Sequence, residues 1–199
     1  QVNYPILAAN VLNKEGQPAF GPAYKIIEAQ GVKIGIVGFL TQYIPHWEKP
    51  SIIKDLTFQS ILTTAKDILP DLRQSVDLLI VAYHGGFERD LQTGLPTESL
   101  TGENEAYQLV EEYKDYIDAL VTGHQHREIA DHLFGVPVIQ PGYRGAFVGE
   151  IELELDNHKK VVASNARLHK TENCKVSSEV NQLISDVSEE AEDWLDQPM

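Results

Sequence analysis

Histidines at two places in the sequence have the type and spacing to bind a metal ion. His84 comes directly after the apolar segment 77–83 and is followed by two glycines. His124 and His126 lie two residues apart, just after a second apolar segment at 118–121. Side chains two residues apart can point the same way, so His124 and His126 could reach one metal or two adjacent metals. Imidazole combined with carboxylates suits zinc, iron, manganese or nickel.

The alternative is that these histidines cap the ends of strands by hydrogen bonding to the backbone. A His-x-His pair is a weak signal by itself, because seven histidines in 199 residues can produce that spacing by chance. The position of both sites at consecutive strand ends favours the metal-binding interpretation. The single cysteine, Cys174, argues against a cysteine-based structural zinc site and excludes an intramolecular disulfide.

The segments around these histidines alternate between strand and helix patterns. Apolar, β-branched stretches at 32–40, 77–83 and 118–121 predict buried strands. Helical spacing predicts a helix capped by Thr57 that runs toward Arg73, and a second helix over 103–113. Strands that alternate with helices indicate a parallel sheet, and open α/β sheets bind ligands at the carboxyl ends of their strands. We therefore expect an α/β fold with both histidine sites at one edge of the sheet.

The remaining chain has a different pattern. Alternation with period two in the last third predicts antiparallel strands. Further strands are expected at 5–11, 24–29, 136–140, 147–155 and 160–169. An apolar stripe over 176–195 predicts an amphipathic helix at the end of the sequence.

Composition limits the classes of partner. Lysine and arginine total 16 against 30 acidic residues, a formal net charge of −14. Binding to a nucleic-acid polymer needs a basic surface that neutralises phosphates, so this class of partner is not expected. The longest apolar run is far shorter than the roughly 20 residues of a membrane span, so no membrane span is expected. A small anionic substrate remains compatible with this charge, because a bound metal supplies local positive charge.

Longer motifs around the histidines resemble those of the calcineurin-like metallophosphoesterases, in the 5′-nucleotidase and 2′,3′-cyclic-nucleotide 2′-phosphodiesterase branch. The motifs are the strand ending in His84-Gly85-Gly86, the segment Glu103-Asn104-Glu105-Ala106-Tyr107, and Gly123-His124-Gln125-His126 with the strand before it. Segments 5–10, 44–49 and 141–145 are also similar to that branch. The resemblance covers nearly the whole chain, and the Gly-His-x-His element is its most specific part.

The resemblance implies part of a four-layer metallophosphoesterase β-sandwich flanked by helices, with two divalent metal ions (Mn, Zn, Fe or Mg) as cofactors. It implies His84 and His124 as ligands of the second metal, and His126 as a ligand of the first. In the intact protein, a metal-bridging hydroxide would attack the phosphorus of a nucleotide phosphoester. Arg144 could clamp a phosphate oxygen and Tyr143 could flank a base, although a surface arginine and an aromatic that covers the core are the simpler roles.

The sequence departs from the family pattern before His84. The family motifs Asp-x-His, Gly-Asp and Gly-Asn-His, which supply the other ligands and the general-acid histidine, are absent. Residues 1–170 are therefore expected to be the C-terminal part of a metallophosphoesterase domain. Residues 171–199 are expected to be an amphipathic linker helix toward an absent C-terminal nucleotide-binding domain. The expected partners are a nucleotide substrate and these missing parts of the same protein.

Ligand counting predicts that this chain alone is inactive. Three neutral histidines cannot neutralise two divalent cations, so at most one metal is expected to bind, weakly. The expected function of the intact protein is divalent-metal-dependent hydrolysis of nucleotide phosphoesters. The alternative is a non-catalytic binding or assembly module with a single-metal or metal-free histidine site. Residues 1–12 show no export signal, and the resemblance favours export to the periplasm or cell wall over a cytoplasmic location.

Four polar residues near these motifs have less specific expectations. Glu88 and Asp90 are expected to be solvated loop charges, with a role in orienting His84 as the alternative. Glu103 and Asn104 are expected only to serve the start of a helix, where acidic residues favour the positive end of the helix dipole.

Overall fold

The computed structural model describes residues 2–197, which fall into two compact units. The larger unit extends to His169 and contains both histidine sites, and the smaller unit begins at Lys170.

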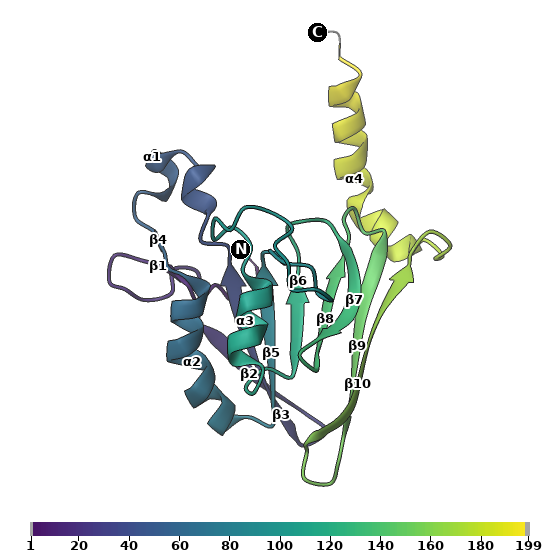
Figure 1. Cartoon of the computed structure of the whole chain (residues 1–199). Helices are drawn as coiled ribbons and strands as arrows, with labels where there is room; N and C mark the ends of the chain where they lie inside the picture. Colours follow the sequence, from purple (N-terminus) through teal and green to yellow (C-terminus); the bar gives the residue numbers. More distant parts are fainter. Residues whose placement is uncertain (1, 198–199) are drawn as a thin grey trace. The chain divides into compact units, whose positions relative to one another are not determined.

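A six-stranded mixed sheet forms the centre of the larger unit, in the order β2-β3-β5-β6-β8-β7 (Figure 1). Its strands are β2 (Tyr24–Ala29), β3 (Val32–Leu40), β5 (Leu78–His84), β6 (Ala119–Thr122), β7 (Glu128–Leu133) and β8 (Val136–Pro141). The four inner strands run parallel, and β2 and β7 pair antiparallel at the two edges. The predicted α/β architecture with parallel pairing is therefore confirmed, and the carboxyl ends of β5 and β6 meet at one edge of the sheet.

Two amphipathic helices, α2 (Ile61–Ser75) and α3 (Ala106–Tyr113), cover one face of this sheet (Figure 1). Apolar side chains at helical spacing lie on one side of each helix, and the sheet buries them. The resulting core includes Val37, Phe39, Leu79, Val81 and Leu120 from the sheet and Ile61, Ala65, Leu69, Leu72, Leu109 and Val110 from the helices.

The first helix begins later than the sequence predicts. Ser60, not Thr57, caps α2, and the Ser60 side chain accepts a hydrogen bond from the backbone N–H of Thr63. Thr57 is held extended because it lies in β4 (Thr57–Phe58), which pairs antiparallel with β1 (Val11–Leu12). The sequence prediction that Thr57 caps the helix is therefore wrong.

The segments before and after β3 are less regular than predicted. The strand expected at 5–11 is wrong except for Val11, because the backbone before β1 packs on β3 instead: Ala9 N–H donates to the carbonyl of Gly38. After β3, a 3₁₀ turn, η1 (Ile44–His46), and a short helix, α1 (Pro50–Ile53), connect to β4. The turn η1 brings an aromatic segment to the sheet edge that holds the histidines.

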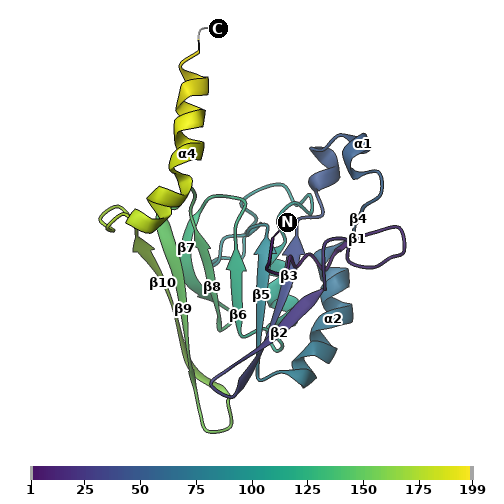
Figure 2. The same cartoon turned by 180° about the vertical axis from the view of Figure 1, so that it is seen from behind.

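A long hairpin follows the six-stranded sheet. It consists of β9 (Phe147–Leu155) and β10 (Val161–Lys170), which form a two-stranded sheet of their own (Figure 2). β9 passes close to β8, because a Cβ added to Gly149 would lie 2.7 Å from the Cδ1 atom of Ile139. The two predicted strands at 147–155 and 160–169 are therefore present.

The described residues of the smaller unit contain one helix, α4 (Ser178–Leu195), and the Ser177 side chain caps its start by accepting a hydrogen bond from the backbone N–H of Val180. The amphipathic helix predicted over 176–195 is present with nearly the same bounds. Among residues 2–197, no helix combines the length and apolar character needed to cross a membrane.

Candidate metal centre

The two histidine loops lie side by side at the carboxyl ends of β5 and β6. Tyr83 of β5 is opposite Thr122, the last residue of β6, so His84, the last residue of β5, and Gly123 lie at the same edge of the sheet. The backbone N–H of Gly123 donates to the carbonyl of Gly85 at 3.1 Å, which joins the loops. The rings of His84 and His124 contact each other edge to face, with centroids 5.5 Å apart. The structure therefore brings these two predicted ligands together.

Two glycines allow this close approach. A Cβ on Gly85 would lie 2.0 Å from the Cζ atom of Tyr83, and a Cβ on Gly86 would lie 2.1 Å from Oε1 of Gln125. The Gln125 side chain in turn accepts from the backbone N–H of Phe87 at 2.9 Å and donates to its carbonyl at 3.0 Å. Only glycine leaves room for a neighbouring side chain this close to the backbone.

Both histidines of the second loop have left-handed backbone conformations. The φ angle is 68° at His124 and 58° at His126. Residues other than glycine rarely adopt this region, which costs on the order of 1–3 kcal/mol and is concentrated at functional sites. The alternation of a strained and an unstrained residue turns the His124 and His126 side chains in directions that a regular strand would not give them.

Burial and charge keep His84 in the form that binds metals. Although part of the side chain is exposed, partial burial lowers the pKa of His84, and the nearby His124 and His126 lower it further. The imidazole is therefore unprotonated at neutral pH, which leaves a lone pair for coordination.

His126 lies with the two predicted substrate-binding residues. Its ring stacks on the ring of Tyr143, with centroids 5.2 Å apart and an interplanar angle of 15°. The guanidinium carbon of Arg144 lies 5.5 Å from the centroid of the Tyr143 ring. Within residues 2–197, no group of three or more His, Cys, Asp or Glu side chains lies close enough together to hold a metal. The assignment of His84, His124 and His126 as ligands therefore stays a prediction.

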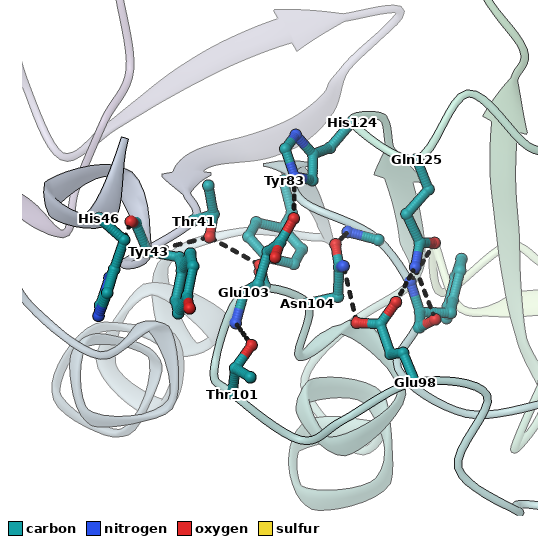
Figure 3. Close-up of polar contacts among 12 residues, drawn as sticks. Thr41, Tyr43, His46, Tyr83, Glu98, Thr101, Glu103, Asn104, His124 and Gln125 are labelled. Carbon is teal, nitrogen blue, oxygen red and sulfur yellow. Dashed lines mark hydrogen bonds and ion pairs between the residues drawn. The ribbon is translucent and has the colours of Figure 1, made fainter. Parts of the chain in front are cut away.

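Sequence reasoning missed two contacts made by the segment before α3. An oxygen of the Glu103 carboxylate accepts a hydrogen bond from Nε2 of His124 at 2.9 Å. Asn104 is buried, accepts from the backbone N–H of Gly86 at 2.6 Å and donates to Glu98 at 2.8 Å (Figure 3). Both residues precede α3, which begins at Ala106, so the expectation that they serve only the helix start is wrong. Their position in a motif of the resembling family was the available signal.

The expectation that Glu88 is a solvated loop charge is also wrong. Glu88 is only 4% exposed, and its carboxylate accepts from the backbone N–H groups of Tyr107 and Gln108 at the start of α3. Burial raises the pKa of Glu88, and these hydrogen bonds oppose the rise. Its carboxylate thus anchors the helix that follows Glu103.

Asp90 has a different environment. Hydrogen bonds from Thr93 lower the pKa of Asp90, and its side chain accepts hydrogen bonds from Gln92 and Thr93 rather than from His84.

A group of aromatic side chains at η1, made of Tyr43, His46 and Trp47, lies against the His124 ring. The Trp47 and His124 ring centroids are 5.2 Å apart, and Tyr43 stacks on His46 at 3.8 Å. Trp47 is half-exposed, so one side of this group faces solvent. Trp47 lies in a segment that resembles a family motif, but its contact with a candidate ligand was not predicted.

An open pocket of about 560 Å³ adjoins this group. It is lined by Thr97, Glu98, Glu103, Asn104, His124, Gln125 and Arg127. A second pocket, of about 290 Å³, is lined by His84, Gly123 and apolar residues near the ends of β3, β5 and β6. The two histidine rings therefore contribute to neighbouring hollows with different linings, one polar and one largely apolar.

Comparison with known proteins places this geometry in a family of nucleotide phosphoesterases. No family model matches the sequence. The chain is 30% identical over 169 residues to the 2′,3′-cyclic-nucleotide 2′-phosphodiesterase/3′-nucleotidase of Salmonella typhimurium, covering 77% of the chain and 23% of that protein. It is 28% identical over 178 residues to the trifunctional nucleotide phosphoesterase protein YfkN of Bacillus subtilis, covering 77% of the chain and 12% of that protein.

Solved structures show the same fold. A Staphylococcus aureus structure assigned as a 5′-nucleotidase, in complex with alpha-ketoglutarate, has a TM-score of 0.86 and 37% identity over 98% of this chain and 38% of that one. The structure of the calcineurin-like phosphoesterase YfkN from Bacillus subtilis has a TM-score of 0.82 at 24% identity, over 98% of this chain and 65% of that one. The predicted fold class is therefore confirmed.

The chain spans between about an eighth and a quarter of the length of the curated relatives cited above. Their names describe hydrolysis of nucleotide phosphoesters, and the solved structures carry the calcineurin-like fold. This chain belongs to the family of 5′-nucleotidases and 2′,3′-cyclic-nucleotide 2′-phosphodiesterases.

Proposed function

We propose that this chain is the second half of the metallophosphoesterase domain of a longer enzyme, which hydrolyses 5′-nucleotides or 2′,3′-cyclic nucleotides with the help of divalent metals. The observation that carries the proposal is the contact between the rings of His84 and His124, with centroids 5.5 Å apart. Open α/β sheets bind ligands outside the carboxyl ends of their strands, and these two imidazoles lie at that edge of the sheet.

The donor set fits part of a metal centre. His84 is unprotonated at neutral pH because its pKa is lowered, and nitrogen donors suit zinc, manganese and iron. We assign His84, His124 and His126 as ligands, with the remaining ligands supplied by other parts of the longer protein. When bound, divalent metals would neutralise charge on the phosphate and act as Lewis acids.

Tyr143 and Arg144 are proposed to bind substrate beside these ligands. The stack of Tyr143 on His126 places an exposed aromatic ring within reach of a bound nucleotide. The Arg144 guanidinium lies at that ring and can donate two parallel hydrogen bonds to a phosphate. These roles place the phosphate near His126 and the base or sugar over Tyr143.

The uncovered face of the sheet supports a longer domain. Figure 2 shows the face of the strands opposite α2 and α3. Ile36, Ile80 and Ala82 are only half-buried on this face, and Val121 is 39% exposed. Adjacent apolar side chains of this kind mark a contact surface. We propose that residues 1–170 complete their sandwich against the first half of the domain, and that 171–199 leads to a C-terminal nucleotide-binding domain.

We also propose that the protein is exported to the periplasm or cell wall, as the family resemblance favours. Fractionation of cells that express the tagged full-length protein tests this point. Recovery with periplasmic or cell-wall marker proteins supports export, and recovery with cytosolic markers contradicts it.

The catalytic proposal is tested by hydrolysis of 2′,3′-cyclic AMP and of 5′-AMP by the full-length protein, with manganese and after chelation. His124→Ala is compared with His158→Ala, a histidine in the exposed turn between β9 and β10. We expect turnover that requires metal, a loss on the order of 100-fold or more in His124→Ala, and no change in His158→Ala. Equal rates for the two variants would remove His124 from the mechanism.

The same assay on the 199-residue chain tests whether this part of the protein is active by itself. We expect negligible turnover from the chain alone, because the general acid and the other ligands come from elsewhere. Turnover by the isolated chain would show that its own residues suffice. Metal binding without turnover in the full-length protein would favour the non-catalytic binding module.

A further inference from the structure

The carboxylate of Glu103 and the imidazole of His124 form a pair that the proposed chemistry does not yet use. Nε2 of His124 donates to Oε1 of Glu103 at 2.9 Å (Figure 3). We propose that Glu103 is a positioning residue that selects the His124 tautomer with hydrogen on Nε2 and leaves the Nδ1 lone pair free for a metal ion. This inference rests on the proposed function, because it assigns a role to a neighbour of a proposed ligand.

The Glu103 backbone is held in place before its side chain reaches the histidine. Its carbonyl accepts from Oγ1 of Thr41 at 2.6 Å and from the hydroxyl of Tyr83 at 3.2 Å. Its N–H donates to Oγ1 of Thr101 at 3.3 Å. Three hydrogen bonds with three separate residues therefore fix the position of the Glu103 backbone, and with it the position of the carboxylate (Figure 3).

The chemistry of the pair determines the tautomer. A carboxylate only accepts hydrogen bonds, so the ring nitrogen that faces Glu103 must carry the hydrogen. A neutral imidazole carries one such hydrogen, so the other nitrogen, Nδ1, keeps a lone pair. Figure 3 shows Nε2 toward the carboxylate and the second nitrogen directed away from it. A hydrogen-bonded carboxylate also raises the basicity of the coordinating nitrogen and fixes the ring.

Two aromatic neighbours restrict the ring further. Trp47 lies with its centroid 5.2 Å from that of His124 at an angle of 31°, and the His84 ring meets it edge to face at 5.5 Å. Rotation of the His124 ring would break the hydrogen bond to Glu103 and disturb both contacts. The ring is thus oriented by three residues from three different segments.

The tautomer is measured directly by long-range proton–nitrogen NMR of the metal-free protein. We expect wild-type His124 to show hydrogen on Nε2, and Glu103→Ala to show a mixture of tautomers. Glu103→Gln keeps an oxygen acceptor, so we expect it to restore most of the Nε2–H form. Side-chain changes at 103 leave the three backbone hydrogen bonds in place, and the backbone amide spectrum reports whether each variant folds.

Metal affinity is measured on the same proteins by calorimetry with Mn²⁺ and Zn²⁺. We expect Glu103→Ala to weaken binding by roughly 10- to 100-fold, with partial recovery in Glu103→Gln. Glu150→Ala is the matched control, because it breaks a His–Glu hydrogen bond to His169 on the β9–β10 hairpin, and it should leave affinity unchanged.

Two results would overturn the positioning role. One is a wild-type His124 with hydrogen on Nδ1, and the other is a tautomer and metal affinity that do not change in Glu103→Ala. If wild-type protein bound no metal while its tautomer still depended on Glu103, the positioning role would be supported and the metal centre would be the part that fails.

Discussion

Replacement of Gly86 by alanine tests how the two histidine loops are interlocked. The added Cβ would lie 2.1, 2.3 and 2.6 Å from Oε1, Cδ and Cγ of Gln125, far inside contact distance. All three nearest atoms belong to the Gln125 side chain. We therefore expect Gln125 to be displaced from Phe87, with which its amide makes two hydrogen bonds.

The cost follows from the bonds that are lost. Gln125 gives up its two hydrogen bonds to the Phe87 backbone and one to Glu98. Each contributes roughly 0.5–1.5 kcal/mol, so the loss of all three in Gly86→Ala should lower the free energy of unfolding by about 1.5–4.5 kcal/mol. A change of this size moves the midpoint of urea denaturation clearly, because m-values for small domains are about 1–3 kcal/mol per molar urea.

A double-mutant cycle isolates the clash. Gln125→Ala removes the three atoms nearest to the new Cβ, so Gly86→Ala should cost little in that background. We expect a coupling free energy of at least about 1 kcal/mol between positions 86 and 125. If the two single costs instead add in the double variant, the clash with Gln125 is not the cause and the packing argument is wrong.

Three further predictions concern buried or partly buried polar groups, each measured by urea denaturation. Asn10 is fully buried and makes three hydrogen bonds to the backbone, so Asn10→Ala should cost about 3 kcal/mol, and a cost below 1 kcal/mol would contradict this role. Glu88→Ala leaves two N–H groups of α3 without their acceptor and should cost about 2 kcal/mol; no loss would show that α3 does not need this cap. Burial, then the charges of Glu88 and Glu112, raise the pKa of Glu105 to about 7, so the folded protein holds the Glu105 proton more tightly than the unfolded chain does. The stabilisation of the fold by this proton is complete below about pH 4.5 and is lost as the pH rises through 7. Stability should therefore fall by about 1–2 kcal/mol from pH 5 to 8, and Glu105→Gln should remove this fall; an equal fall in the variant would exclude Glu105 as its source.

The order of strands and helices was predictable because local patterns determine it. The continuous apolar run before His84 has the length and residue types of a buried strand, and the shorter run before Gly123 behaves in the same way. Two consecutive parallel strands then place His84 and His124 at one edge of the sheet. This part of the site follows from periodicity and from the geometry of parallel sheets.

The carboxylates could not be assigned from local patterns because their partners lie far away in the sequence. Glu88 contacts residues 19 and 20 positions later, and Glu103 contacts His124 across 21 positions. Nothing in the residues around Glu88 distinguishes a buried helix cap from a solvated charge. The same limit explains Thr57, whose place in β4 depends on pairing with Leu12.

The relation between His126 and the other two histidines depends on backbone conformation that spacing alone does not give. A regular strand would direct side chains two apart the same way, whereas left-handed conformations at His124 and His126 redirect both. His126 accordingly lies on Tyr143, while His124 lies between His84, Trp47 and Glu103.

The most direct test of the metal centre is anomalous diffraction from crystals of the full-length protein grown with Mn²⁺ or Zn²⁺. We expect an anomalous peak about 2.0–2.1 Å from a nitrogen of His84 and from Nδ1 of His124. Well-ordered peaks elsewhere, with both imidazoles left uncoordinated, would contradict it.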